Sequence, residues 1–451
     1  MAPRSILLPV ATALAALGVA SSAQAAVDVS LDRGVLAVTG GADPDQIAIA
    51  GDDRRIRVTV GSTEHSFRRS AVHDVVVRLG DGEDRVRLDA GVAARIEGGE
   101  GFFDAVTVVG SEYDDELALT AAGDRARVRG EAHVDLETLE RVEFETAGGE
   151  DSVTVGDVTG TVVNDVEADL GADQDRLQAL GTPEPDFTDT SGGPADVFLF
   201  GLPALVRARN AEDVAMRGLA GDDRMNASSS APVTLDGGTG GDDLDGGPAA
   251  DLLLGGPGDD FVAGDGGDDR AFLDGGFDIF LWDPGDGSDS VEGGRGTSDV
   301  MLFRGSADAE RFQLSADGRR TRLLRDVGSI AMDFDGMEKV EVGLRAGADR
   351  FDVGDMSRTD VGWVVAELAS GIAGQSLDQA ADAITVEGTR RDDAIAVADT
   401  VGGVRVSGLP AMVDVLRPEP ALDTLTLATG SGDDTVDQSA MTPGAIGLAV
   451  E

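Results

Sequence analysis

Cysteine is absent from this chain, and lysine, tyrosine and tryptophan are close to absent. Without cysteine the protein has no disulfides, no thiolate zinc site and no lipid anchor on a cysteine. Aromatic residues make up only 4% of the sequence, so we expect a thin core of mainly aliphatic side chains. Basic residues are scarce as well, because 36 Lys and Arg stand against 85 Asp and Glu and leave a formal net charge of −49. A chain this acidic is not expected to bind nucleic acid, since phosphate contacts need positive charge.

The excess of negative charge opposes compaction unless something neutralises it. Charge alone leaves two interpretations open. The carboxylates bind a divalent cation, or they form an acidic surface suited to a salty habitat.

Catalytic motifs are also missing from the sequence. It contains no H-E-x-x-H zinc motif and no G-x-S-x-G nucleophile motif. The histidines, His65, His73 and His133, are scattered and are interpreted as surface strand residues. Carboxylate pairs are too common here for their spacing to indicate glycosidase chemistry. We therefore predict that the protein is not an enzyme, with a β-helical polysaccharide-acting enzyme as the least favoured alternative.

The N-terminus has the features of a secretory signal. Arg4 precedes an apolar run over residues 6–20, and Ala23-Gln24-Ala25 forms a small-x-small cleavage site. The run is shorter than the roughly 20 apolar residues that span a bilayer. We expect cleavage after Ala25 and an extracellular or cell-surface location, with no membrane span.

Short strands are predicted throughout the rest of the chain. Ile56, Val58 and Val60 alternate with Arg57 and Thr59, which is the period of two that gives a strand one apolar face. Gly-Asp turns separate such segments. The predicted fold is all-β.

A large internal duplication organises these strands. The segment 136–143 (LETLERVE) recurs at 334–341 (FDGMEKVE), and 221–228 (GDDRMNAS) recurs at 432–439 (GDDTVDQS). Residues 26–97 resemble the back half of the same unit. The predicted organisation is a signal peptide at 1–25, a partial β-rich unit at 26–97, copy 1 at 98–236, a β-roll at 237–292 and copy 2 at 293–451.

Residues 237–272 form four contiguous nonapeptides with the pattern G-G-x-G-x-D-x-U-x, where U is apolar. Glycines provide positive φ angles and let backbone carbonyls converge on one point. Calcium takes six to eight oxygen ligands and accepts carbonyls and carboxylates together. One loop cannot supply that many oxygens, but two stacked loops can. The sixth position is held by Asp242, Asp251, Asp260 and Asp269, and the apolar position by Leu244, Leu253, Val262 and Ala271.

Each nonapeptide is interpreted as half a coil, so that loops 18 residues apart stack on each other. Gly237–Asp242 should then stack on Gly255–Asp260, and Gly246–Asp251 on Gly264–Asp269. The first pair keeps every consensus glycine, whereas the second has Ala249 and Asp265 in place of two of them. We therefore expect the first pair to bind calcium more tightly. The candidate metal-binding residues are Gly237, Thr239, Asp242, Gly246, Asp251, Gly255, Pro257, Asp260, Gly264, Gly266 and Asp269.

Other acidic turns leave alternatives open. Asp283, Asp286 and Asp289 form either another calcium loop or an acidic turn that closes the roll. The turns at 148–151, 347–349 and 432–434 are interpreted as plain strand turns. For the whole block, the alternative is a flexible Gly/Asp-rich linker, which four in-register repeats argue against.

The block resembles the hemolysin-type (RTX) calcium-binding repeat. The segment 277–303 resembles the sequence found directly after such repeats in secreted bacterial calcium-binding proteins. The resemblance implies a right-handed parallel β-roll, or β-helix-like block, with calcium between its turns, and it implies no activity. The chain departs from the family in having only four good repeats and a Sec-type signal. The predicted function is an exported calcium-binding protein whose partner is the calcium ion, with a calcium-stapled adhesin or matrix protein as the alternative.

Overall fold

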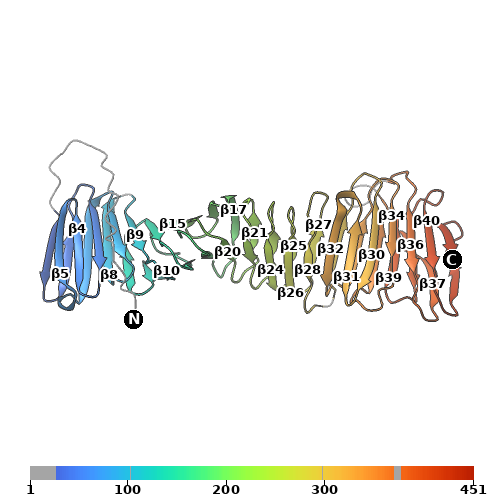
Figure 1. The fold of residues 1–451 in the computed structure, drawn as a ribbon. Coiled ribbons are helices and arrows are strands. Elements are labelled where there is room, and N and C mark those ends of the chain that lie inside the picture. The colour runs from blue at the N-terminus through green and yellow to red at the C-terminus, as the bar shows by residue number, and fades with distance from the viewer. Residues whose placement is uncertain (1–26, 102, 297, 370–376) are drawn as a thin grey trace, which may run out of the picture.

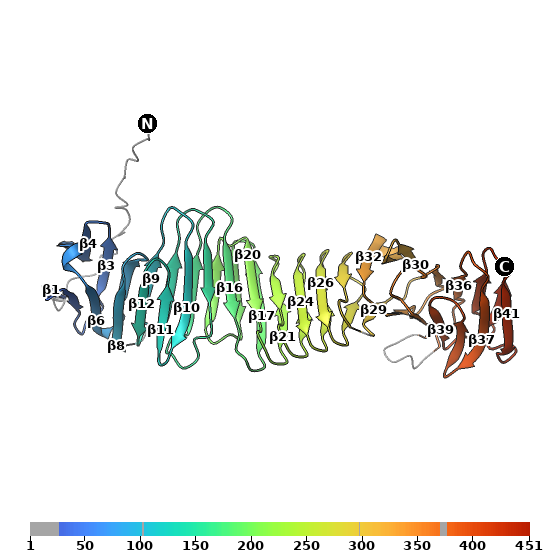
Figure 2. The same ribbon diagram turned by 90° about the horizontal axis from the view of Figure 1, so that it is seen from below.

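The computed structural model describes residues 27–101, 103–296, 298–369 and 377–451. The predicted signal peptide lies outside the described residues. The rest forms an elongated solenoid in which strands stack along one long axis, from β1 and β5 near one end to β41 and β42 at the other (Figures 1 and 2). The described residues contain strands and two short 3-10 helices, η1 (Arg69–Ala71) and η2 (Val327–Ser329), and no α-helix. The all-β prediction is therefore confirmed, and two long, mostly parallel sheets fit a β-roll or β-helix-like solenoid.

Sheet A is a single row of 21 strands in the described part of the chain. Most neighbours in the row are parallel, because the chain returns to the same sheet after passing through the other. In spatial order the strands are β1 (Asp28–Asp32), β2 (Val35–Thr39), β6 (Asp74–Gly82), β8 (Ala94–Gly101), β12 (His133–Glu137), β11 (Arg125–Arg129), β10 (Glu116–Ala122), β14 (Ser152–Val155), β16 (Arg176–Leu180), β20 (Asp213–Arg217), β22 (Thr234–Asp236), β24 (Leu252–Pro257), β26 (Arg270–Gly275), β28 (Ser290–Glu292), β32 (Ile330–Asp335), β31 (Arg320–Arg325), β30 (Arg311–Asp317), β34 (Arg350–Val353), β36 (Ala383–Glu387), β40 (Thr424–Ala428) and β42 (Gly447–Val450).

Sheet B faces sheet A and is also a row. Its order is β5 (Thr63–Arg68), β4 (Arg55–Val60), β3 (Gln46–Gly51), β7 (Arg85–Asp89), β9 (Ala105–Val109), β13 (Arg141–Glu145), β15 (Asp165–Asp169), β19 (Leu205–Arg209), β18 (Asp196–Phe200), β17 (Phe187–Gly193), β21 (Arg224–Ala227), β23 (Asp243–Asp245), β25 (Phe261–Ala263), β27 (Ile279–Trp282), β29 (Val300–Arg304), β33 (Lys339–Gly343), β35 (Trp363–Glu367), β39 (Met412–Leu416), β38 (Gly403–Ser407), β37 (Ala394–Thr400) and β41 (Thr435–Ala440).

Antiparallel three-stranded segments interrupt the parallel rows at matching places. In residues 98–236 they are β10–β11–β12 in sheet A and β17–β18–β19 in sheet B. In residues 293–451 the corresponding segments are β30–β31–β32 and β37–β38–β39. The strand order around them also recurs, so the duplicated sequences have the same local topology. Both sheets run through the predicted domain boundaries, and the five-part division stays a prediction from the sequence.

The core lies between the two sheets, where every second side chain of a strand points inward. In the nonapeptide block it is narrow, and the apolar residues Leu244, Leu253, Val262 and Ala271 are fully buried. The core is mainly aliphatic, as expected, but the few buried aromatic residues are concentrated further along the chain. Trp282 stacks on Phe303 with ring centroids 4.0 Å apart. Phe280, Phe312, Phe334 and Phe351 are fully buried in the same region.

Turns join the sheets along two edges of the solenoid. We call edge 1 the row of turns that lead from sheet A to sheet B, such as the turn between β22 and β23. Edge 2 is the row that leads from sheet B back to sheet A, such as the turn between β23 and β24. The Gly/Asp sequences of the chain occupy both edges.

Candidate metal centre

The four position-six aspartates lie in two stacked pairs. On edge 1 the backbone amide of Asp242 donates a hydrogen bond to Oδ1 of Asp260, at 2.8 Å. On edge 2 the amide of Asp251 donates in the same way to Oδ1 of Asp269, at 2.7 Å. In each pair the two residues are 18 positions apart. The spacing of 18 residues therefore stacks the same turns that the sequence predicts to be paired.

These carboxylates are buried, and in each of them only one of the two oxygens accepts a hydrogen bond. Each of the four residues is at most 4% exposed. Oδ1 accepts a backbone amide in all four, and the donors to Asp242 and Asp251 are Asp223 and Val233 of the preceding coil. The second oxygen, Oδ2, is buried in all four residues and has no hydrogen-bond partner. A buried carboxylate oxygen without a partner is costly, so a proton, a cation or an ordered water is expected at this position.

In the edge 1 pair the first glycine of each repeat faces this oxygen. An ideal Cβ built on Gly237 would lie 2.3 Å from Oδ2 of Asp242. One built on Gly255 would lie 2.5 Å from Oδ2 of Asp260 and 3.1 Å from the carbonyl oxygen of Leu273. A side chain at this position would collide with the carboxylate oxygen, so glycine allows that oxygen to lie close to the backbone and, at Gly255, near a carbonyl oxygen of the next coil.

Thr239 and Pro257, the third residues of the two edge 1 repeats, are predicted metal-binding residues, but their carbonyl oxygens accept backbone hydrogen bonds. The carbonyl oxygen of Thr239 accepts the amide of Gly221 at 2.9 Å, and that of Pro257 accepts the amide of Gly240 at 3.1 Å. These carbonyls therefore join neighbouring coils. Each carbonyl oxygen has a second lone pair, but the observed partner of Thr239 and of Pro257 is a backbone amide of the neighbouring coil.

On edge 2 the predicted residues come together with one difference. An ideal Cβ on Gly246 would lie 2.6 Å from the carbonyl oxygen of Gly264, and one on Gly264 would lie 2.5 Å from Oδ2 of Asp269. Gly266 instead donates its amide to the carbonyl of Gly247, at 2.7 Å. Gly264 is thus arranged like the first glycines of edge 1, whereas Gly246 faces a carbonyl of the next coil and Gly266 belongs to the backbone ladder.

Burial shifts the ionisation of these groups. Removal from water raises the pKa of Asp251 to about 6, of Asp260 to about 7 and of Asp269 to about 8. Neighbouring carboxylates add to the effect on the pKa of Asp260 and Asp269, and burial also raises the pKa of Asp242. The protein alone therefore disfavours the ionised form of these carboxyl groups.

The donor set fits a hard cation such as calcium. It consists of carboxylate and backbone carbonyl oxygens, which calcium prefers over nitrogen and sulfur ligands. Among the described residues no three His, Cys, Asp or Glu side chains cluster as a metal site. Side chains alone would therefore not form a coordination shell, and backbone oxygens would have to supply most of the ligands.

The aspartate stacks extend beyond the four repeats, which the sequence did not predict. Asp223 precedes Asp242 on edge 1, and Asp278 and Asp299 follow Asp260. Their Oδ2 atoms are buried and lack partners too. The available signal was an aspartate at the end of each Gly/Asp turn. These turns do not match the repeat pattern fully, because Leu219 and Asp274 replace the second glycine in two of them.

The three aspartates of the DPGDGSD segment have separate roles. Asp289 continues the edge 2 stack, because its Oδ1 accepts the amide of Asp269 at 2.9 Å. Asp283 forms an ion pair with Arg304 at 2.8 Å, and Asp286 accepts the amide of Asp283. The segment thus joins the stack through one residue and forms a turn with the other two.

Two of the three outlying Gly-Asp turns have the same half-satisfied carboxylate. Oδ2 is buried without a partner in Asp151 and in Asp349. Asp434 is only partly buried, and its Oδ1 accepts the amide of Asp393 at 2.8 Å. The interpretation of these turns as plain strand turns stays a prediction.

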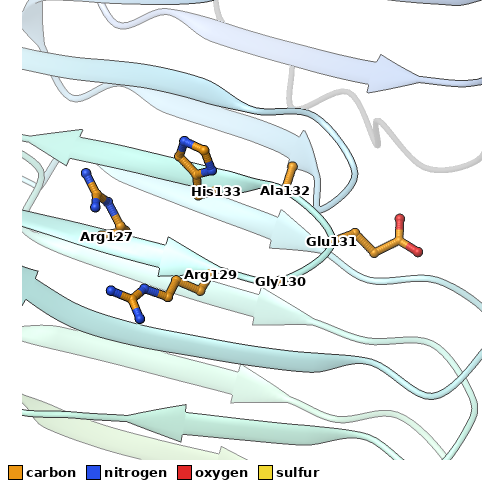
Figure 3. A pocket seen from close by; sticks show the side chains of 6 residues that line it. All are labelled: Arg127, Arg129, Gly130, Glu131, Ala132 and His133. Atoms are coloured by element: carbon orange, nitrogen blue, oxygen red, sulfur yellow. The ribbon is translucent and has the colours of Figure 1, made fainter.

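A shallow cavity of about 320 Å³ lies at the hairpin between β11 and β12. Its lining includes Arg127, Arg129 and His133, while the carboxylate of Glu131 points away from the imidazole (Figure 3). Arg127 is held by Asp135, with Nε 2.5 Å from Oδ1. The cavity is therefore lined mainly by basic side chains, and its lining residues do not place an acid beside a base as a catalytic pair would (Figure 3).

Comparisons with known proteins give no further assignment: no protein-family model matches the chain, and no characterised protein matches it significantly. Within the described residues, no helix is long and apolar enough to cross a membrane.

Proposed function

We propose that this protein is an exported calcium-binding protein without catalytic activity, in which ions between stacked Gly/Asp turns stabilise the β-roll at 237–272. The observation that carries the proposal is that Asp242, Asp251, Asp260 and Asp269 each have a buried, unpartnered Oδ2 in a turn that begins with glycine. The resemblance of the repeats to hemolysin-type (RTX) sequences supports it independently.

Electrostatics favours a cation over the alternatives. An ionised carboxylate that is buried alone either takes up a proton or finds a positive partner. The chain has 36 basic residues for 85 acidic ones, so arginines cannot neutralise every stack. Extracellular calcium modules bind in the range of about 10⁻⁴–10⁻³ M, so an exported protein would meet calcium at a concentration that suits such sites.

Calorimetry of the full chain tests the proposal. Purified protein freed of metal with EGTA is titrated with calcium, and in parallel with magnesium. We expect calcium to bind and to raise the melting temperature. We expect magnesium to have a smaller effect, since it demands near-ideal octahedral geometry and loses its water reluctantly. Absence of calcium binding at millimolar concentration would contradict the proposal.

The elongated solenoid favours a second candidate, a calcium-stapled surface adhesin or matrix component (Figure 1). A rod suits a spacer between a cell and its surroundings. Fractionation of the native cells separates the two roles, because a free secreted protein appears in the medium and a surface component stays with the envelope.

A further inference from the structure

A turn of the same kind lies one coil before the nonapeptide block. Residues 218–223 (GLAGDD) lead from β20 to β21 on edge 1 and place Asp223 at the sixth position. Met225 occupies the apolar position and is 1% exposed. The amide of Asp223 donates to Oδ1 of Asp242 at 2.8 Å, the same distance as from Asp242 to Asp260. The turn is therefore in register with the repeats, although its sequence does not match them fully.

The mismatch is at the second position, where Leu219 replaces glycine. Leu219 has a φ of 78°, in the left-handed region that Gly238 and Gly256 adopt with 99° and 104°. This region is uncommon for a residue with a bulky side chain. Leu219 is also 41% exposed, so burial of its side chain does not explain the conformation. The surrounding coils thus impose the backbone of a repeat turn on a residue that disfavours it, and such strain often marks a functional position.

The first glycine of this turn lies against two oxygen atoms from different coils. An ideal Cβ on Gly218 would lie 2.0 Å from Oδ2 of Asp223 and 2.5 Å from the carbonyl oxygen of Gly237. Asp223 is 1% exposed, and its Oδ2 has no hydrogen-bond partner. A carboxylate oxygen of one coil and a carbonyl oxygen of the next therefore approach one point, and the carboxylate oxygen has no donor there.

We propose that a calcium ion binds between the turns 218–223 and 237–242, with Asp223 Oδ2 and the Gly237 carbonyl among its ligands. The cation array then begins one coil before the four repeats and joins the block to the duplicated unit that precedes it. The inference rests on the proposed function, because it assumes that the solenoid binds calcium.

Asp84 provides a matched comparison within the chain. Its Oδ1 accepts the amide of Asp45 at 2.7 Å, as Oδ1 of Asp223 accepts the amide of Asp186 at 2.7 Å. Asp84 is also on edge 1, is fully buried and has an unpartnered Oδ2. Its turn, however, begins with Leu79, whose side chain is fully buried, where the candidate site has a glycine. Asp84 therefore has the same buried carboxylate but a bulky side chain at the first position of its turn, and we expect it to bind no ion.

The test counts calcium ions per chain by native mass spectrometry in full-length wild type, Asp223→Asn and Asp84→Asn. Asparagine keeps the shape of the side chain and its Oδ1 acceptor. We expect Asp223→Asn to bind one ion fewer than wild type and Asp84→Asn to bind the wild-type number. A wild-type count in Asp223→Asn, or an equal loss in both variants, would overturn the inference.

A second measurement covers the case in which Asp223→Asn does not fold. Crystals of the wild-type chain grown with terbium in place of calcium should give an anomalous peak between Gly218 and Asp242. Peaks confined to the 237–272 turns would refute the additional site and leave the proposed function intact. If wild type binds no calcium or terbium at all, the proposed function fails first.

Discussion

The amide of Asp242 donates to Oδ1 of Asp260 at 2.8 Å, and this contact links two turns that are 18 residues apart in the sequence. Each aspartate thus uses one oxygen to bind the coil before it and leaves the other without a partner. The stack is held together by hydrogen bonds from backbone amides to carboxylate oxygens, and it buries a row of carboxyl groups that become negative charges when they ionise. If calcium compensates that charge, its removal should have measurable effects on affinity, order and stability.

The two predicted pairs should differ in affinity. Asp260→Ala should weaken calcium binding more than Asp251→Ala, because the edge 1 pair keeps all its glycines. On edge 2, Asp265 replaces a glycine and has a left-handed φ of 58°. Loss of a group that only supports a metal ligand costs about 10- to 100-fold in affinity, so loss of a direct ligand should cost at least that much. Calorimetric titration of both variants measures the difference, and equal losses would contradict the ranking.

Calcium should order the nonapeptide block more than its flanks. Ordering a residue costs about 1–2 kcal/mol of backbone entropy, whereas a buried apolar side chain contributes about 1.5–3 kcal/mol. The block buries only five apolar side chains, Leu244, Leu253, Val262, Ala263 and Ala271, so its own core cannot offset that cost. A ligand at a hundredfold excess over its Kd adds about 2.7 kcal/mol per site. Amide exchange with calcium and with EGTA should therefore change mainly in 237–272.

The flanking units are the internal control for that experiment. Their strands bury more apolar side chains, Val142 and Phe144 in β13 and Val340 and Val342 in β33, and should keep their protection in EGTA. Protection of 237–272 that is the same with and without calcium would refute the mechanism.

The first glycine of the repeat should be indispensable for the site. Gly255→Ala would place a Cβ 2.5 Å from Oδ2 of Asp260, so the carboxylate would have to move. We expect at least a tenfold loss of calcium affinity, which is about 1.4 kcal/mol. Gly362→Ala is the control, because no atom lies within 4 Å of its ideal Cβ. A normal calcium titration for Gly255→Ala would show that the oxygen does not face a ligand.

Much of the fold can be predicted from the sequence because its signals are local. Alternation of apolar residues gives the strands, and a fixed nine-residue repeat gives the stacking of turns. The antiparallel segments such as β10–β11–β12 were not predicted, because their strands alternate like any others. The buried ion pair between Arg325 and Glu310 was not predictable either, since an arginine in a strand usually reaches solvent. Asp223 was missed because Leu219 breaks the glycine pattern while adopting the glycine conformation.

Without calcium, the stability of the protein should fall as the pH rises. Burial raises the pKa of Asp260 to about 7 and of Asp269 to about 8, well above the ordinary value of 3.8. The folded state therefore holds these protons more tightly than the unfolded state does. The stabilisation from protonation is fully present below about pH 4 and is lost as the pH rises through about 7 and 8.

Calcium should reverse this trend, because it binds the deprotonated carboxylates and must displace their protons. We expect the rise in melting temperature produced by calcium to be small at about pH 5 and large at about pH 8, while in EGTA the protein melts at a lower temperature at about pH 8 than at about pH 5. Thermal melts at both pH values with millimolar calcium and with EGTA measure the two trends. Asp260→Asn should diminish the pH dependence of the calcium effect, since it removes one titrating ligand. A calcium effect that is equal at both pH values would mean that the buried aspartates are not the ligands.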